Sequence, residues 1–468
     1  MTVALLLLAS ALASAPQTPV SDPSLSFGRF GTVSIYRPTA APTSVALFFS
    51  GDGGWNQGVV DMARAAAAGG TLVLGVDTPR YLKAMDARGD RCSYFAADAE
   101  ALSQYAQKSL GLAHYQPPVL VGYSSGAGLV YATLAQAPDN TFEGALSIGF
   151  DPLLPTQTSP CDRNGLASTL GPNGRGRRVG PVAKLSAPWL ILQGEEDVVS
   201  PIEQVEAFTK DIPGSEIVRL PHVGHGFSKP LTWMPQFRAA LTRLVAAPAG
   251  DATAQPAPLG ELPVVELPAP ANPADFFAIV LSGDGGWASI DKQIGEELVK
   301  SGVPTVGFNS LQYFWQKRSP EEISADLARM IRHYQATFHR ERVILIGYSL
   351  GANVLPLMTS RLPAELLDQV QLIAFLGLEH QTDLEFRMGD WLAAQHAAAF
   401  KLLPEMQKLQ GRPMLCVYGT KEGDTLCPDL PAGLADVVEI KGGHHFDGDF
   451  HGLARLILSH VKPDARSP

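Results

Sequence analysis

Two serines of the chain lie in the pattern Gly-x-Ser-x-Gly. Ser124 lies within Gly122–Gly126 and Ser349 within Gly347–Gly351, and an apolar run precedes each pattern. In a turn between a strand and a helix, the two glycines let the backbone bend so sharply that the serine hydroxyl stands above the sheet. One match would be weak evidence. Two matches, each followed by acidic residues and histidines, indicate nucleophilic catalysis by serine.

A serine nucleophile requires a base, and the base requires an acid that orients it. Hydrolases that use this turn supply these groups in the chain order Ser, Asp, His. For Ser349 we expect His444 to be the base and Asp424 to orient it. The neighbouring residues Glu422 and His445 remain alternatives for these two roles.

The first half of the chain offers an equally complete set. Ser124 is followed by Asp197 in the motif Gly-Glu-Glu-Asp and by His225 in the motif Gly-His-Gly-Phe. The residue types alone leave open whether this half turns over substrate. The histidines and aspartates of 444–451 could also suggest a metal cluster, but a flexible acidic loop needs no ion, and we expect no metal and no cofactor.

Acyl transfer builds a negatively charged oxygen, and two backbone N–H groups normally stabilise it. The motif Ser-Gly-Asp-Gly-Gly-Trp follows an apolar run in both halves. In enzymes of this kind, the loop after such an early strand supplies the second N–H donor. We expect the donors to be the amides of Asp284 and Leu350 in the second half. In the first half we expect those of Asp52 and Ser125.

These sequence motifs recur in the same order in the two halves, at offsets between 219 and 232 residues, which indicates a duplication. Short apolar runs alternate with amphipathic stretches, for example a helix expected over 320–334. The sequence therefore predicts an α/β protein with two tandem α/β-hydrolase domains, each a mostly parallel sheet with helices on both faces. We place the domains at 24–247 and 262–464, with a linker rich in Pro and Ala at 248–261.

Composition limits the classes of partner. Hydrophobic residues make up 46% of the 468 residues, and 36 Lys and Arg stand against 46 Asp and Glu, a net charge of −10. This balance argues against nucleic acid as a partner. Residues 1–15 are apolar and end in small residues, which predicts a cleaved signal peptide and export. We expect the four cysteines of such a protein to pair within each half, Cys92 with Cys161 and Cys416 with Cys427.

The second half, over 262–462, resembles the AcvB/VirJ family of bacterial virulence proteins. The similarity is carried by Ser282–Trp287, Tyr313–Trp315, Gly347–Ala352, Val354–Pro356, Cys416–Gly419, Cys427–Pro428 and Gly443–Phe446. The whole layout, two halves of which the second is VirJ-like, is similar to AcvB-type members. The sequence departs from the family pattern at Asn353, where an acidic residue is expected.

The resemblance implies a periplasmic hydrolase that cleaves the aminoacyl ester of lysyl- or alanyl-phosphatidylglycerol at a membrane surface. We expect a carboxylate, Asp284 or Glu379, to face the ammonium group of that substrate. The residues predicted to contact the substrate are Gly285, Gly286, Trp287, Tyr348 and Glu379. A general periplasmic esterase or peptidase, and a non-catalytic binding protein associated with virulence or secretion, remain alternatives. The sequence predicts no oligomeric state.

Overall fold

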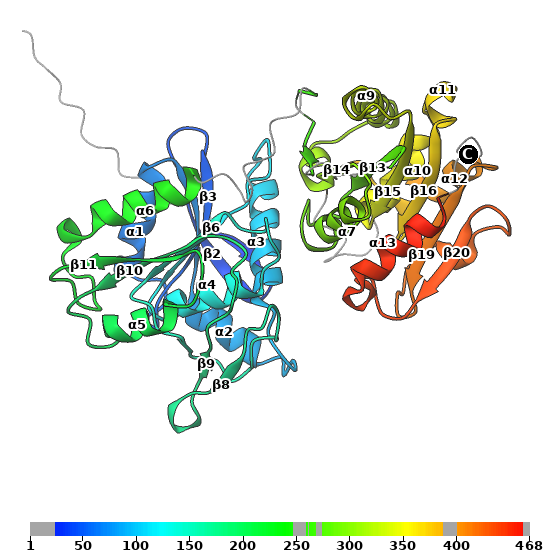
Figure 1. Ribbon diagram of the computed structural model, residues 1–468. Helices are drawn as coiled ribbons and strands as arrows, with labels where there is room; N and C mark the ends of the chain where they lie inside the picture. The colour runs from blue at the N-terminus through cyan, green and yellow to red at the C-terminus, as the bar shows by residue number, and fades with distance from the viewer. Residues whose placement is uncertain (1–23, 247–258, 261, 268–273, 387–399, 462–468) are drawn as a thin grey trace, which may run out of the picture.

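The computed structural model describes residues 24–246, 259–260, 262–267, 274–386 and 400–461, and each half forms its own sheet covered by helices (Figure 1). The first sheet has the strand order β1-β2-β4-β3-β5-β6-β10-β11, in which the pairs β1–β2 and β2–β4 are antiparallel and the others parallel. Its strands are β1 (Leu25–Phe27), β2 (Gly31–Tyr36), β3 (Ser44–Phe49), β4 (Thr71–Val76), β5 (Val119–Tyr123), β6 (Gly144–Ile148), β10 (Trp189–Gly194) and β11 (Ser215–Leu220).

The second sheet repeats this order, without a counterpart of β1 among the residues that the structure describes. Its order is β12-β14-β13-β15-β16-β19-β20, and β12–β14 is the antiparallel pair. The strands are β12 (Val264–Glu266), β13 (Phe276–Leu281), β14 (Thr305–Phe308), β15 (Arg342–Tyr348), β16 (Val370–Leu376), β19 (Met414–Gly419) and β20 (Asp436–Ile440). The predicted fold class, two tandem α/β-hydrolase units, is confirmed.

Helices cover both faces of each sheet. In the first half these are α1 (Gln57–Ala68), α2 (Thr78–Asp86), α3 (Phe95–Ser109), α4 (Ser125–Gln136), α5 (Ile202–Thr209) and α6 (Met234–Ala246). In the second they are α7 (Ser289–Lys300), α8 (Ser310–Tyr313), α9 (Pro320–Phe338), α10 (Leu350–Thr359), α11 (Ala364–Leu367), α12 (Leu402–Gln407) and α13 (Phe450–Ser459). Small sheets of β7 (Leu153–Leu154), β8 (Ser168–Leu170) and β9 (Arg177–Val179), and of β17 (Gln381–Thr382) and β18 (Phe400–Lys401), complete the described elements.

The central strands are apolar throughout because both of their faces are buried. In β3, Val45, Leu47 and Phe49 belong to the core that also contains residues of α2–α5, whereas Ala46 and Phe48 belong to the core under α1 and α6. Successive side chains of a strand point to opposite faces, so an uninterrupted apolar run supplies both cores. The second half divides its cores in the same way, with α7 and α13 on one face.

The helix expected over 320–334 is α9, which starts at the predicted residue and continues to Phe338. Its start is fixed by Ser319, whose hydroxyl accepts a hydrogen bond from the N–H of Glu322, while the Glu322 carboxylate accepts one from the N–H of Ser319. This reciprocal pair satisfies two N–H groups that a helix end leaves without partners.

Both predicted disulfides are present, Cys92–Cys161 and Cys416–Cys427. The predicted signal peptide, residues 1–15, lies outside the described residues, and so does most of the predicted linker. Leu259 and Leu262 are described and belong to the core of the second half. The domain boundaries given above stay predictions.

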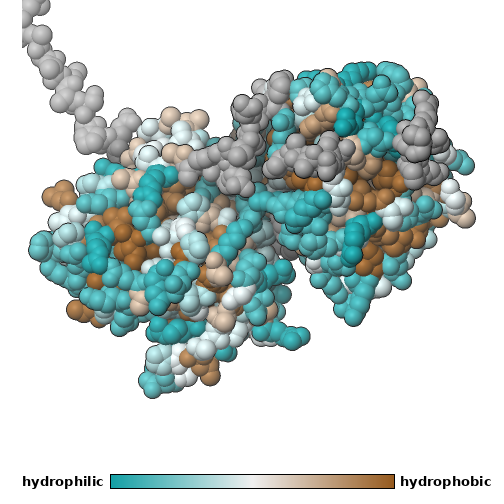
Figure 2. Space-filling model, viewed as in Figure 1, coloured by the Kyte–Doolittle hydropathy of each residue, from teal (hydrophilic) through white to brown (hydrophobic). Residues whose placement is uncertain are grey.

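The surface mixes polar and apolar residues on the face that Figure 2 shows. Within the described part of the chain, every helix is too short or too polar to cross a bilayer.

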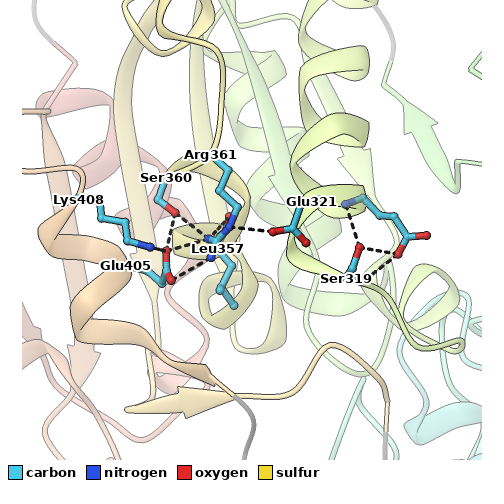
Figure 3. Close-up of polar contacts among 8 residues, drawn as sticks. Ser319, Glu321, Leu357, Ser360, Arg361, Glu405 and Lys408 are labelled. Carbon is cyan, nitrogen blue, oxygen red and sulfur yellow. Dashed lines mark hydrogen bonds and ion pairs between the residues drawn. The ribbon is translucent and has the colours of Figure 1, made fainter.

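A partly buried ionic network holds the end of α10, the helix that begins beside Ser349 (Figure 3). The guanidinium of Arg361 donates to both carboxylate oxygens of Glu405 on α12, at 2.8 and 3.1 Å. Ser360 and Lys408 also donate to this carboxylate, at 2.7 and 2.8 Å. Burial alone would raise the pKa of Glu405, but these donors lower it to about 2.

We expect Glu405→Gln to lower the free energy of unfolding at pH 7 by about 2 kcal/mol, because hydrogen bonds to a charged group are lost. Since the folded carboxyl has its pKa near 2, below the ordinary 4.5, its contribution is complete above pH 4.5 and is lost as the pH falls towards 2. Urea unfolding of both proteins at pH 7 and at pH 3 measures this difference.

The control is Glu365→Gln, which removes the carboxylate of the exposed pair that Arg332 and Glu365 form at 3.1 Å, and we expect little change from it. An equal loss from both variants, or a Glu405→Gln effect independent of pH, would contradict the assignment.

Candidate active sites

The structure brings the three predicted residues of the first half together. The Ser124 hydroxyl lies 2.9 Å from Nε2 of His225, and Nδ1 of His225 lies 2.8 Å from the Asp197 carboxylate. The Asp197 side chain is fully buried and also accepts hydrogen bonds from the backbone N–H groups of Val199 and Ser200. Burial raises the pKa of this carboxyl, but the donors outweigh it, so the pKa of Asp197 is lowered.

Both nucleophile candidates lie in a strained turn. Ser124 follows β5 and precedes α4 with φ of 54°, and Ser349 follows β15 and precedes α10 with φ of 53°, values that L-residues rarely adopt. The flanking glycines are required because a Cβ atom at Gly122 would lie 2.1 Å from the carbonyl oxygen of Gly126. At Gly347 it would lie 2.4 Å from that of Gly351.

The predicted oxyanion donors belong to segments that lie beside each serine. Ser125 and Leu350 are the first residues of their helices, so their N–H groups have no acceptor within the helix. In the loop of Asp284, the N–H of Gly286 closes a turn onto the carbonyl of Gly283, and a Cβ atom at Gly283 would lie 3.3 Å from that of Ser349. The loop therefore lies directly beside the serine.

The loop of Asp52 in the first half is built in the same way. Gly54 donates to the carbonyl of Gly51, and a Cβ atom at Gly51 would lie 3.2 Å from that of Ser124. Asp52 and Asp284 are both exposed at the tips of these turns.

The acidic partner in the second half differs from the predicted one. Nδ1 of His444 is hydrogen-bonded to the carboxylate of Glu422, whose side chain is 5% exposed. Asp424, predicted to orient His444, is 71% exposed and lies 2.7 Å from Nδ1 of His380 instead. The expectation for Asp424 is wrong in this respect, because only Glu422 lies on the buried side of the loop where it reaches His444.

The sequence contains a signal for Glu422. Asp197 stands three residues after Gly194, the end of β10, and Glu422 stands three residues after Gly419, the end of β19. Glu422 also lies 225 residues after Asp197, the same offset that separates Ser349 from Ser124. The motif Gly-Asp points to Asp424, whereas the distance from the end of the strand points to Glu422.

His444, the predicted base, is the histidine that bonds the acid. Burial of its ring lowers the pKa of His444, but the hydrogen bond and charge of Glu422 outweigh burial and raise it above its ordinary value. The alternative, His445, has its Nδ1 2.8 Å from the Tyr348 hydroxyl, and burial together with the charge of His444 lowers its pKa. No hydrogen bond joins Ser349 to His444 in the described part of the chain.

The tyrosine before each serine holds the histidine loop. Tyr123 donates from its hydroxyl to the carbonyl of His225 at 2.9 Å, and Tyr348 lies 3.3 Å from the carbonyl of His444. Tyr348 was predicted to contact the substrate, and its hydroxyl is already engaged with this loop. The structure thus assigns Tyr348 a positioning contact.

Trp287, also predicted to contact the substrate, packs into the interior. Its ring is 5% exposed, and a Cβ atom at Gly307 of β14 would lie 2.5 Å from that ring. Trp287 therefore anchors the loop of Asp284 to the sheet, and its contact with substrate stays a prediction. The adjacent glycines differ, since Gly285 is exposed and Gly286 is buried with φ of 76°.

Glu379 is half-buried and is held by Asn353. Asn353 donates to the Glu379 carboxylate at 3.0 Å and accepts from the Glu379 N–H at 2.9 Å. An acidic residue at 353 would repel this carboxylate, so the departure from the family pattern suits Glu379. Burial, followed by the charge of Asp424, raises the pKa of Glu379.

No group of three or more His, Cys, Asp or Glu side chains that could hold a metal ion occurs among the residues described.

Comparison with protein families supplies a match across both halves. The model of the bacterial virulence protein VirJ matches residues 43–151 and 275–465. The chain belongs to the VirJ family. That both halves of this VirJ-family protein match one family model agrees with the duplication of its strand order. A search of curated proteins gave no match.

Solved structures similar to the chain include esterases and a serine hydrolase homologue, each of which covers about half of the chain. The esterase domain of a Rhodothermus marinus protein is 19% identical, with a TM-score of 0.31, and covers 46% of this chain and 92% of its own. An alpha-beta serine hydrolase homologue from Coxiella burnetii is 19% identical, with a TM-score of 0.32, covering 49% and 98%. Thermogutta terrifontis esterase 2, phosphonylated by sarin, is 17% identical, with a TM-score of 0.35, covering 49% and 96%.

Glu422→Gln is expected to lower kcat for ester hydrolysis at the second site about a thousandfold, because the neutral amide no longer stabilises the charged imidazole. The assay uses a p-nitrophenyl ester and protein carrying Ser124→Ala, so that only the second site contributes. Asp424→Asn is the matched control, and we expect it to change the rate little. A larger loss from Asp424→Asn than from Glu422→Gln would restore the original assignment.

The pH profile of the same protein is expected to show an acid limb above pH 6.5. His444 must be neutral to accept a proton, and its raised pKa keeps it protonated to a higher pH than an ordinary histidine. Glu422→Gln removes the charge that raises this pKa, so the limb should move to lower pH in the residual activity. An unmoved limb would show that another group titrates there.

Proposed function

We propose that the second half of the chain is a serine hydrolase that cleaves the aminoacyl ester of lysyl- or alanyl-phosphatidylglycerol. The observation that carries this proposal is the pairing of His444 with the buried Glu422, beside the strained turn of Ser349. Membership of the VirJ family supports it. The acid is Glu422, so the set is Ser-His-Glu in this half and Ser-His-Asp in the first.

The chemistry follows from the residues. Ser349 attacks the ester carbonyl while His444 accepts its proton, and the amides of Asp284 and Leu350 stabilise the oxyanion. The carbonyl–oxygen bond to the glycerol breaks, and His444 returns the proton to that oxygen, which leaves an aminoacyl-enzyme. Water, deprotonated by His444, then attacks the aminoacyl-enzyme and releases the free amino acid.

The charge around the serine suits a substrate with an ammonium group. The carboxylates of Asp284 and Glu379 lie close enough for the charge of Asp284 to raise the pKa of Glu379. A cation between them would relieve this repulsion. The substrate carries such a cation on the amino acid that the enzyme releases.

The proposed site of action is the periplasmic face of a membrane. Two disulfides fit an exported protein, and the predicted signal peptide would direct export. The lipid substrate would be presented at the membrane surface.

A second candidate function is esterase activity of the first half on soluble substrates. The specific observation that favours it is the unbroken chain of hydrogen bonds from Ser124 through His225 to Asp197, at 2.9 and 2.8 Å. This set needs no rearrangement to activate the serine.

Hydrolysis of lysyl- and alanyl-phosphatidylglycerol in detergent micelles tests the proposal, with released amino acid as the readout. We expect Ser349→Ala to lower the rate at least about a thousandfold, since residues of such a set act as a unit. Ser124→Ala, the matched control, should leave most of the rate.

Other outcomes would assign the function elsewhere. Loss of release in Ser124→Ala alone would move the activity to the first half. A soluble amino acid ester cleaved as fast as the lipid would favour the general esterase. No release by folded protein would favour binding without turnover.

A further inference from the structure

The first half contributes to the surroundings of the second site. The loop after α3 receives Trp315, whose indole N–H donates to the carbonyl of Leu112 at 2.8 Å. Trp315 is fully buried in a small apolar cluster with Tyr115 of the first half and with Leu311 and Phe386 of the second. Figure 1 shows α3 on the side of the first sheet that is nearest the second half.

Polar contacts fix this arrangement close to the oxyanion loop. Asn140 of the first half donates to the carbonyl of Trp287 at 3.1 Å, and Lys292 on α7 lies 3.2 Å from Asp139. Lys108 on α3 lies 3.1 Å from Glu385. The loop that carries Asp284 is thus held from outside by the first half.

The side chain that α3 brings to this loop is Glu100. A Cβ atom at Gly285 would lie 3.8 Å from Oε1 of Glu100, so the carboxylate lies beside the exposed part of the oxyanion loop. Its hydrogen-bond donor within the described residues is Gln104, one turn along the same helix, at 3.4 Å. This weak contact leaves most of its acceptor capacity available for a ligand.

We infer that Glu100 of the first half is a substrate-binding residue of the second site, where its carboxylate binds the ammonium group of an aminoacyl ester together with Asp284 and Glu379. This inference rests on the proposed function and makes it specific: the site is built by both halves and selects a cationic acyl group.

The charges around Glu100 favour a cationic ligand. Three carboxylates from separate segments, α3, the loop after β13 and the loop after β16, lie close enough that the charge of Asp284 acts on both Glu100 and Glu379. No Lys or Arg forms an ion pair with any of the three in the ranges that the structure describes, and the charge of His444 acts on Glu379. A group of carboxylates without a Lys or Arg partner attracts a cation.

The protonation of Glu100 agrees with this placement. Burial, and then the charge of Asp284, raises the pKa of Glu100 to about 8. Without a cation one proton compensates part of the charge, and a bound ammonium group would replace that proton.

The test compares two soluble esters, lysine ethyl ester and its diacetylated derivative, in which both ammonium groups are neutral amides. All proteins carry Ser124→Ala. We expect Glu100→Gln to raise KM for lysine ethyl ester about tenfold with kcat nearly unchanged, because a charge-assisted contact to the substrate is lost. Hydrolysis of the diacetylated ester should not change.

The matched control is Glu143→Gln. Glu143 is another half-buried glutamate of the first half, and burial alone raises its pKa, to about 7. We expect it to leave both esters unaffected. An equal effect of Glu100→Gln on the two esters would show a structural role, and no effect on either ester would also overturn the inference.

A binding measurement separates this inference from the proposed function. Lysinamide is titrated calorimetrically into protein carrying Ser124→Ala and Ser349→Ala, with and without Glu100→Gln. A Kd about tenfold weaker in the Glu100→Gln protein supports the inference even if the enzyme cleaves no ester. If esters are cleaved and Glu100→Gln leaves the Kd for lysinamide unchanged, only the inference is overturned. If the protein neither cleaves esters nor binds lysinamide, the inference and the proposed function are both overturned.

Discussion

The position of each nucleophile candidate depends on one close approach, the contact between the two glycines that flank its serine. At Gly122 and Gly347 the strand meets the first turn of the following helix at a distance that excludes any Cβ atom. This contact forces the serine into positive φ and lifts its hydroxyl to the carboxyl end of the sheet. Everything else in either site, the oxyanion loop, the histidine loop and the acid, is arranged around a hydroxyl placed in this way.

The two halves surround that hydroxyl with the same kinds of residue, a histidine and an acid, but the hydrogen bonds between them differ. In the first half, serine, histidine and aspartate form a continuous hydrogen-bonded chain. In the second, the histidine is bound to its acid and is surrounded by carboxylates. The duplication therefore preserved the positions of the groups, whereas the charge around them diverged. The first half has also become part of the wall of the second site, through α3.

Much of the fold could be predicted from the sequence because its signals are local. Neighbours in the chain determine the apolar runs, the Gly-x-Ser-x-Gly motifs and the start of α9 at Pro320. The duplication shows the apolar runs and the motifs twice. The acid was missed because Glu422 and Asp424 share one loop, and only the end of β19 decides which side chain turns inward. The packing of Trp287 against Gly307 could not be predicted, because a repeated aromatic residue looks the same in a sequence whether it faces a ligand or the sheet.

The contribution of Glu100 could not be predicted, since sequence patterns do not show which surfaces of two domains meet. Trp315 carries no signal that its partners, Leu112 and Tyr115, lie in the other half. Such contacts arise from the shapes of two folded surfaces, which local sequence patterns do not encode.

The disulfide between Cys416 and Cys427 has a consequence for where the protein can work. It ties β19 to the far end of the loop that carries Glu422, so the acid lies inside a short covalent ring. Before the thiols are oxidised, only non-covalent contacts hold this ring closed, and the histidine can lose its partner. Oxidation of these two cysteines therefore holds the acid covalently beside the histidine, and an oxidising compartment favours this state.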